Sequence, residues 1–314
     1  MHIPKMLIDR KLIVVLFLLL TYVGFSQKSS RAENAQNIQI DSLLLKGVLA
    51  MDRANFDEAI DNIKKAEALS LESKNSSNEA ISNQLLTKIY YELGQYELAG
   101  PYILNAIKLH QELQELNNLG QDYIIYSQIL IKTGNSEKAL PFLENAELIY
   151  QNQRDENSRV QLATTYLYEG NIYQELKQDQ EALTRFQEAE ALLKKIQAKN
   201  NYLLCRVYLQ EGKTNLHLGQ LDPALEYATS AHELSLNNNY PQLEVDALNL
   251  LSKVHSERKE YEEAFSFLSL YNQKRLTYFG DANNNVRNTA IRNALLANIC
   301  LLYTSPSPRD GLLS

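Results

Sequence analysis

The stretch "GNSEKAL", residues 134–140, is one of six similar copies along this chain of 314 residues. The other copies are "ANFDEAI" (54–60), "GQYELAG" (94–100), "KQDQEAL" (177–183), "GQLDPAL" (219–225) and "KEYEEAF" (259–265). Every copy carries an alanine at the same place, and successive alanines lie 40 to 43 residues apart. A fixed period of this length is typical of proteins built from stacked helical hairpins.

Small residues recur in phase with these copies. The repeat alanines are Ala59, Ala99, Ala139, Ala182, Ala224 and Ala264. Twelve positions before them stand Gly47, Thr87, Ser127, Gly170, Gly212 and Ser252. Seven positions after them stand Ala66, Ala106, Ala146, Ala189 and Ala231, with Tyr271 as the departure. Small residues let two helices approach closely, and one hairpin cannot bury its apolar face alone. The pattern therefore predicts an all-α array of six hairpins over residues 40–275.

The motif resembles the tetratricopeptide repeat (TPR) family, long-helix type. The small residue, the turn, the aromatic residue (Phe56, Tyr96 and Tyr261) and the following alanine all match. The resemblance implies a right-handed α-solenoid of about six TPR-like hairpins. The chain departs from the family in its period, which exceeds the usual 34 residues, and in lacking tryptophan. The extra residues would lengthen the helices of each hairpin by about 9 Å in total.

The segment after the sixth hairpin also has a helical pattern. Asn283 to Asn285 can cap a helix, and Val286, Ala290 and Ala294 begin an apolar stripe at a spacing of four residues. We expect an additional helix within residues 276–299. It would cap the array or begin a connection to a further domain.

The first 26 residues read as a signal peptide. Lys5, Arg10 and Lys11 precede an apolar run of 12 residues, 12–23, which is short for a membrane span of about 20 residues. Small residues at Gly24 and Ser26 predict cleavage after Ser26, followed by a short linker at 27–39. The chain is therefore expected to be exported, to the periplasm of a bacterium. An uncleaved signal that anchors the chain in the membrane is the alternative.

The last 15 residues do not fit the repeat. "CLLYTSPSPRD", residues 300–310, back-translates into a string that looks like the transposase adaptor of short-read sequencing libraries. We expect residues 300–314 to be a non-native tail, the natural gene having been truncated near Ile299 with the loss of any domain that followed.

Charge and composition argue against several functions. The net charge is −7 and no basic run stands in the body, which disfavours nucleic acid as a partner. Cys205 and Cys300 are too far apart in sequence to suggest a disulfide framework, and Cys205 reads as a buried apolar residue. The five histidines have no metal-ligand spacing, and no nucleophile motif is present. We therefore expect no enzyme activity, no metal and no cofactor.

The resemblance implies a ligand in the concave groove lined by the first helix of each hairpin. One position after each small residue, polar side chains follow from the second hairpin onward: Lys88, Gln128, Asn171, Lys213 and Lys253. Further candidates are Gln84 and Asn249 one turn earlier, and the tyrosines Tyr91, Tyr168 and Tyr208. Amide and ammonium groups at one-turn spacing suit the backbone and carboxylates of an extended peptide. The family's full carboxylate clamp is not present.

Two functions fit these features. The first is an exported TPR module that binds a peptide or protein segment in its groove. The second is the sensory ectodomain of a membrane signalling protein, a histidine kinase or a helix-turn-helix regulator, whose output domain and membrane attachment would lie in a missing C-terminal segment. The resemblance to the exported TPR regions of bacterial signal-transduction proteins suggests the second.

Overall fold

The computed structural model describes residues 34–196 and 200–279. Within these residues the chain forms helices joined by short turns, and no strand, as the all-α prediction requires. The predicted signal peptide, the expected additional helix beyond residue 279 and the tail lie outside the described residues. Two predicted bounds are corrected. Residues 34–39, expected as linker, are already helical, and residues 276–279 belong to the last helix of the sixth hairpin.

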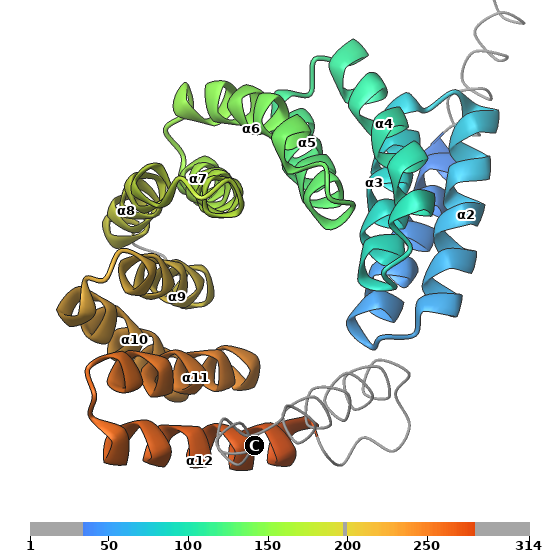
Figure 1. The fold of residues 1–314 in the computed structure, drawn as a ribbon. Helices are drawn as coiled ribbons and strands as arrows, with labels where there is room; N and C mark the ends of the chain where they lie inside the picture. Colours follow the sequence, from blue (N-terminus) through green and yellow to red (C-terminus); the bar gives the residue numbers. More distant parts are fainter. Residues whose placement is uncertain (1–33, 197–199, 280–314) are drawn as a thin grey trace, which may run out of the picture. The chain divides into compact units, whose positions relative to one another are not determined.

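The described helices pair as six hairpins, as the repeat predicted (Figure 1). The first helices of the hairpins are residues 34–52, α3 (Ser76–Glu92), α5 (Leu116–Lys132), α7 (Glu156–Glu175), α9 (Asn201–His217) and α11 (Pro241–Glu257). The second helices are α2 (Phe56–Ser73), α4 (Tyr96–Glu112), α6 (Ser136–Gln151), α8 (Asp179–Lys195), α10 (Leu221–Asn237) and α12 (Tyr261–Phe279).

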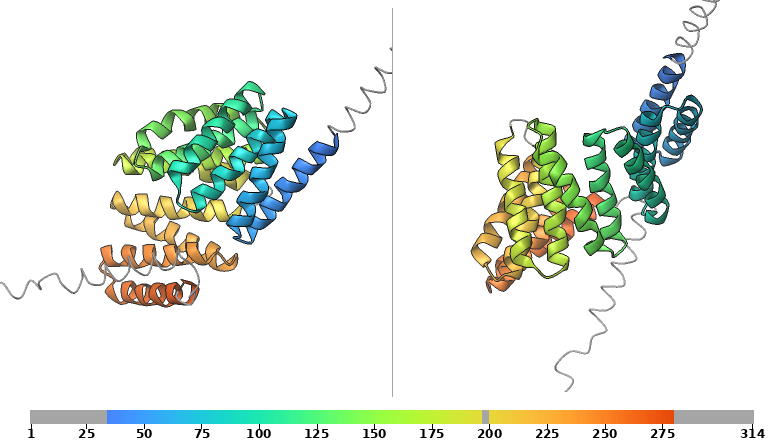
Figure 2. Two further views of the ribbon diagram at one scale, coloured as in Figure 1. Left: turned by 90° about the vertical axis from the view of Figure 1, so that its right-hand side faces the viewer. Right: turned by 90° about the horizontal axis from the view of Figure 1, so that it is seen from above.

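The described residues divide into two compact units, and the boundary in the chain falls between Tyr168 and Glu169 inside α7. Unit 1 contains the helices up to the greater part of α7, and unit 2 contains the rest of α7 and α8 to α12. From α2 to α6 in unit 1, and from α8 to α12 in unit 2, each helix contacts the next one along the chain, as α11 and α12 do side by side in Figure 2. The repeat continues in phase through α7, so the sequence did not predict this boundary.

The phased small residues hold each hairpin together. The first five repeat alanines, and the five alanines seven positions later, are fully buried. The hydroxyls of Ser127 and Ser252 donate to the carbonyls of Ala139 and Ala264, at 3.3 and 3.0 Å. At Gly47, a methyl group would lie 2.5 Å from the side chain of Ile63, so a larger residue could not stand there without displacing it. The sequence therefore predicted the close helix contacts correctly.

The turn inside each hairpin contains one residue with a left-handed backbone. These six residues stand five positions before the repeat alanines: Ala54, Gly94, Gly134, Lys177, Gly219 and Lys259, with φ between 56° and 74°. Glycine adopts this conformation without penalty, whereas other residues are strained in it. Three of the six turns therefore place a residue other than glycine in a strained backbone conformation: Ala54, Lys177 and Lys259.

Candidate functional site

A pocket of about 240 Å³ lies on the first helices of unit 1. Its lining comes from α3 (Lys88, Tyr91, Glu92), α5 (Gln121, Ile124, Ile125, Gln128) and α7 (Gln161, Thr164). Three of the predicted groove residues, Lys88, Tyr91 and Gln128, thus share one pocket. The wall combines an ammonium group, the carboxylate of Glu92, amides, an aromatic ring and isoleucine side chains, so it offers both polar and apolar contacts to one occupant.

Lys88 is half-buried in this pocket, and burial lowers the pKa of its ammonium group. The nearby carboxylate of Asp122 opposes that fall. One turn earlier on α3, the side-chain carbonyl of Gln84 accepts a weak hydrogen bond of 3.5 Å from Lys88 Nζ. A ligand anion placed in the pocket would favour the charged form of Lys88 and would offset the cost of its burial.

Behind Lys88 lies a buried polar network that the sequence did not suggest. Asp122 of α5 is fully buried, and its Oδ2 lies 2.5 Å from Nδ1 of His110 on α4. Its Oδ1 accepts a 2.6 Å hydrogen bond from the amide of Gln84. Burial raises the pKa of Asp122, while the hydrogen bonds from His110 and Gln84 oppose this rise.

Gln84, a predicted groove residue, lies behind the residues that line the pocket. Its side chain is buried and its amide donates to Asp122, so it supports the pocket from behind and does not line it. The reason is the partner at Asp122, which stands 38 residues later and on the next hairpin. A column of residues read along the repeat does not reveal such a contact.

The first helices of unit 2 carry a network of amide side chains. The amide of Gln210 on α9 donates to Oδ1 of Asn171 on α7, and Lys213 Nζ donates to the carbonyl of Gln210 at 3.0 Å. The amide of Gln174 donates to the hydroxyl of Thr214 at 2.6 Å. Two predicted residues, Asn171 and Lys213, are thus joined through Gln210, which is not among the predicted groove residues.

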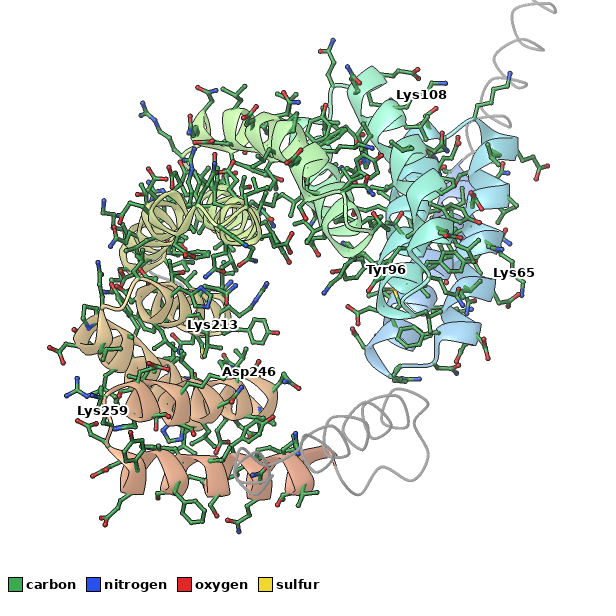
Figure 3. All side chains as sticks on the ribbon, in the orientation of Figure 1. Lys65, Tyr96, Lys108, Lys213, Asp246 and Lys259 are labelled. Carbon is green, nitrogen blue, oxygen red and sulfur yellow. The ribbon has the colours of Figure 1, made fainter. Side chains whose placement is uncertain are left out.

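The lysines of unit 2 differ in their surroundings. Lys213 is half-buried, and burial lowers its pKa; the carboxylate of Asp246 opposes this effect and the charge of Lys253 adds to it. Figure 3 shows Lys213 on α9 and Asp246 on α11 on the same side of unit 2. Burial raises the pKa of Asp246, and Lys213 opposes that rise. The field that a ligand would meet from Lys213 is therefore reduced by a neighbouring carboxylate.

The remaining predicted residues lie at separate places. Tyr168 on α7 and Asn249 on α11 are half-buried, and Lys253 on α11 is exposed. The ring of Tyr208 packs 5.9 Å from the ring of Tyr227 on α10 and 5.8 Å from the ammonium group of Lys194 on α8. It belongs to the contact among α8, α9 and α10.

The described residues were also compared with the expectations for the cysteine, for metal sites and for membrane-spanning helices. Cys205 is buried, its thiol donates to the carbonyl of Ala231 at 3.3 Å, and burial raises its pKa to about 12, which makes it unreactive as a nucleophile. Residues 34–196 and 200–279 contain no cluster of three or more side chains suited to holding a metal ion. Among the helices of these same ranges, none is long and apolar enough to span a membrane.

Comparison with known proteins agrees with this architecture. Residues 123–195 match the tetratricopeptide repeat family. The search of curated proteins gave no match.

Several solved structures share the fold. BtubC (BKLC) from P. vanneervenii is 18% identical, the match covers 80% of this chain and 95% of that one, and the TM-score is 0.56. A signal transduction ATPase with a tetratricopeptide repeat sensor from Pyrococcus horikoshii is 18% identical, with 94% of this chain and 47% of that one covered and a TM-score of 0.62. A Rap protein complexed with Competence and Sporulation Factor is 16% identical, with 76% and 75% covered and a TM-score of 0.55.

Proposed function

We propose that this tetratricopeptide-repeat protein is an interaction module, which binds a peptide or protein segment on the face formed by its first helices. The observation that carries the proposal is the pocket of unit 1, because three residues selected from the repeat, Lys88, Tyr91 and Gln128, line it together. The Rap protein among the structural neighbours was crystallised with a bound factor, which is consistent with a binding role for such a fold.

The chemistry of the pocket favours a segment with an acidic side chain or a free carboxylate. Lys88 supplies a partly desolvated charge, and a hydrogen bond to a charged group contributes about 1.5–3 kcal/mol. Gln121, Gln128 and Gln161 supply amides that can pair with a peptide backbone. Each lysine has a carboxylate nearby, Asp122 for Lys88 and Asp246 for Lys213. Unit 1 is the better candidate for the anion because Lys88 lines the pocket there, while Asp122 is already bonded to Gln84 and His110.

Selection from a displayed library of random peptides tests this function. The full chain is the bait, and enriched peptides are then measured against the paired variant Lys88→Met with Gln128→Leu. We expect acidic or carboxylate-ended sequences whose affinity falls at least about tenfold on the variant. If nothing is enriched, or if the variant binds every selected peptide as well as the parent chain does, the pocket is not a peptide site.

Export of the protein is part of the proposal. It rests on the basic and apolar segments within residues 1–26. Mass spectrometry of the protein secreted by a bacterial host should give a chain that begins at Gln27. A mature chain that retains residues 12–23 would support a membrane anchor instead.

The alternative role is that of the sensory ectodomain of a membrane signalling protein. It differs from the first role in the coding sequence that it predicts after codon 299. The natural reading frame beyond codon 299 would encode a membrane-spanning helix and a kinase or DNA-binding domain. Sequencing the intact gene from its source decides between the two roles.

A further inference from the structure

His110 and Asp122 are a paired departure from the repeat. His110 stands 11 positions after a repeat alanine, where the buried equivalents are Ser70, Tyr150, Leu193 and Ser235. Asp122 stands 17 positions before a repeat alanine, where the buried equivalents are Ser82, Thr165, Val207 and Ala247. The other two equivalents, Arg275 and Ser42, are not buried. The other hairpins thus pack at these buried positions without a histidine and carboxylate pair, so packing does not explain the pair.

The pair is also costly to bury. Asp122 and His110 have no exposed surface, and an uncharged filling of the same space is often as stable as a buried ionisable pair or more so. Nδ1 of His110 is bonded to Asp122 at 2.5 Å, while the carboxylate of Glu115 lies 3.7 Å from its Nε2. Three further groups interact electrostatically with Asp122, from three helices: Lys88 on α3, Tyr123 on α5 and Tyr150 on α6.

Gln84 connects this pair to the pocket of unit 1. Its side-chain nitrogen donates to Oδ1 of Asp122 at 2.6 Å. A side-chain amide has one donor end and one acceptor end, so the carbonyl oxygen of Gln84 is left to face Lys88, whose Nζ donates to it at 3.5 Å. This orientation is the same whether the proton between His110 and Asp122 rests on one or the other, because Oδ1 accepts from Gln84 in both cases.

We propose that Asp122 is the positioning residue of this pocket, and that through Gln84 it holds the ammonium group of Lys88 in place for an anionic group of the bound segment. The proposal rests on the proposed function, since it concerns the lysine that would meet the segment. A side chain that is ordered before binding loses less conformational entropy when the segment binds. The carboxylate of Asp122 also opposes the fall in the pKa of Lys88 that burial causes.

Asp122→Asn tests this role, because asparagine keeps the shape of aspartate but has one acceptor oxygen in place of two. It cannot accept from His110 and Gln84 through separate oxygens. Where its amide nitrogen faces Gln84, the Gln84 side chain has to turn, and two donors then meet at Lys88. The variant also removes the negative charge. We therefore expect the pKa of Lys88 to fall.

Competitive acetylation of the full chain over a range of pH, followed by mass spectrometry, measures this change. Acetic anhydride reacts with the neutral amine only, so the midpoint of the rate profile does not depend on how freely the reagent reaches the side chain. At neutral pH, and relative to its own limiting rate, Lys88 should react at least about threefold faster in Asp122→Asn than in the parent chain.

Two other lysines are controls in the same digest. Tyr102 and Tyr90, on α4 and α3, raise the pKa of Lys64 on α2, so an unchanged midpoint of Lys64 shows that these helices still pack together. Lys213 is a half-buried lysine of unit 2, and its midpoint should not change either.

Gln84→Met separates positioning from charge. It removes both ends of the amide, keeps a side chain of similar length and leaves Asp122 and His110 in place. Alone it should lower the midpoint of Lys88, which keeps the proposal testable if Asp122→Asn does not fold. In the Gln84→Met background, Asp122→Asn should have less than about half of its effect in the parent chain, because the two changes break the same connection.

Two outcomes would overturn the proposal. The first is an unchanged midpoint of Lys88 in Gln84→Met or in Asp122→Asn while that of Lys64 is also unchanged. The second is an equal effect of Asp122→Asn in both backgrounds, which would mean that Asp122 acts by its charge alone. Failure of the proposed function looks different: Lys88→Met then binds every selected peptide as the parent chain does, while the midpoints of Lys88 still move as expected and support the positioning role.

Discussion

Glu211 of α9 predicts an unusual pH dependence of stability in unit 2. Its side chain is fully buried, and neither carboxylate oxygen meets hydrogen-bond geometry with a partner among the described residues. Burial raises its pKa from 4.5 to about 9; the charge of Glu190 adds to the rise and that of Lys194 opposes it. The folded chain therefore holds a proton on Glu211 at neutral pH, whereas the unfolded chain does not.

The sign and size of the effect follow from this difference. Between about pH 4.5 and 9 the folded state binds one more proton than the unfolded state, so the free energy of unfolding falls as the pH rises. The slope is about 1.4 kcal/mol per pH unit. Glu211→Gln removes the ionisation while keeping the shape, so the difference in stability between variant and parent should grow by about 4 kcal/mol from pH 5 to 8.

Urea denaturation of the parent chain and the variant across this pH range measures the effect. Glu244 of α11 gives a control of opposite sign, because it too is buried but pairs with Lys274 at 2.9 Å and accepts from Tyr278 at 2.7 Å. Burial alone would raise the pKa of Glu244, yet these partners lower it overall. Glu244→Gln should therefore destabilise the chain at neutral pH, and less so as the pH falls through the pKa of the folded state. Parallel pH profiles of the parent and Glu211→Gln would refute the reasoning.

Three further predictions concern the repeat and the face of unit 2. Ala139→Leu should lower the free energy of unfolding by about 1–3 kcal/mol because the site is fully buried against another helix; an unchanged melting temperature would show that the repeat register is wrong. Gly134→Ala should destabilise by about 1 kcal/mol and Lys177→Gly should stabilise by up to about 1 kcal/mol, since both residues have positive φ; thermal unfolding checks both, and equal effects of the same sign would contradict the account. Lys213→Ala combined with Lys253→Ala should weaken the binding of an acidic peptide to unit 2 and reduce its salt dependence, whereas unchanged values would remove this face as a binding site.

The sequence predicted the fold through the spacing of small residues. Ser127 and Ala139 stand 12 positions apart in the chain, and the hydrogen bond between them follows from that spacing in a hairpin of fixed length. Such contacts are local, and the small residues that permit them recur six times in phase, so a single sequence is enough to reveal them. The left-handed turns at Ala54, Lys177 and Lys259 were harder to predict, because only the phase, and not the residue type, marks them.

The candidate site was only partly predictable. Lys88 and Gln128 lie on successive first helices at the same repeat position, so the column of the repeat brought them together. The contact of Gln84 with Asp122 and His110 joins three helices at positions that no repeat rule connects. Gln161 and Thr164 line the pocket from positions ten and seven residues before Asn171, the residue predicted on α7, so the column of the repeat did not select them.

The central claim, that the pocket of unit 1 binds a peptide through Lys88, is tested most directly by one ratio of dissociation constants. A peptide selected on the parent chain is titrated calorimetrically into two variants, Lys88→Met and Lys108→Met. Lys108 stands on α4 with a side chain that is 71% exposed, outside the pocket (Figure 3). Loss of a hydrogen bond to a charged group should weaken binding to the Lys88 variant about tenfold or more, and the Lys108 variant should bind as the parent does. Equal dissociation constants for the two variants would contradict the account.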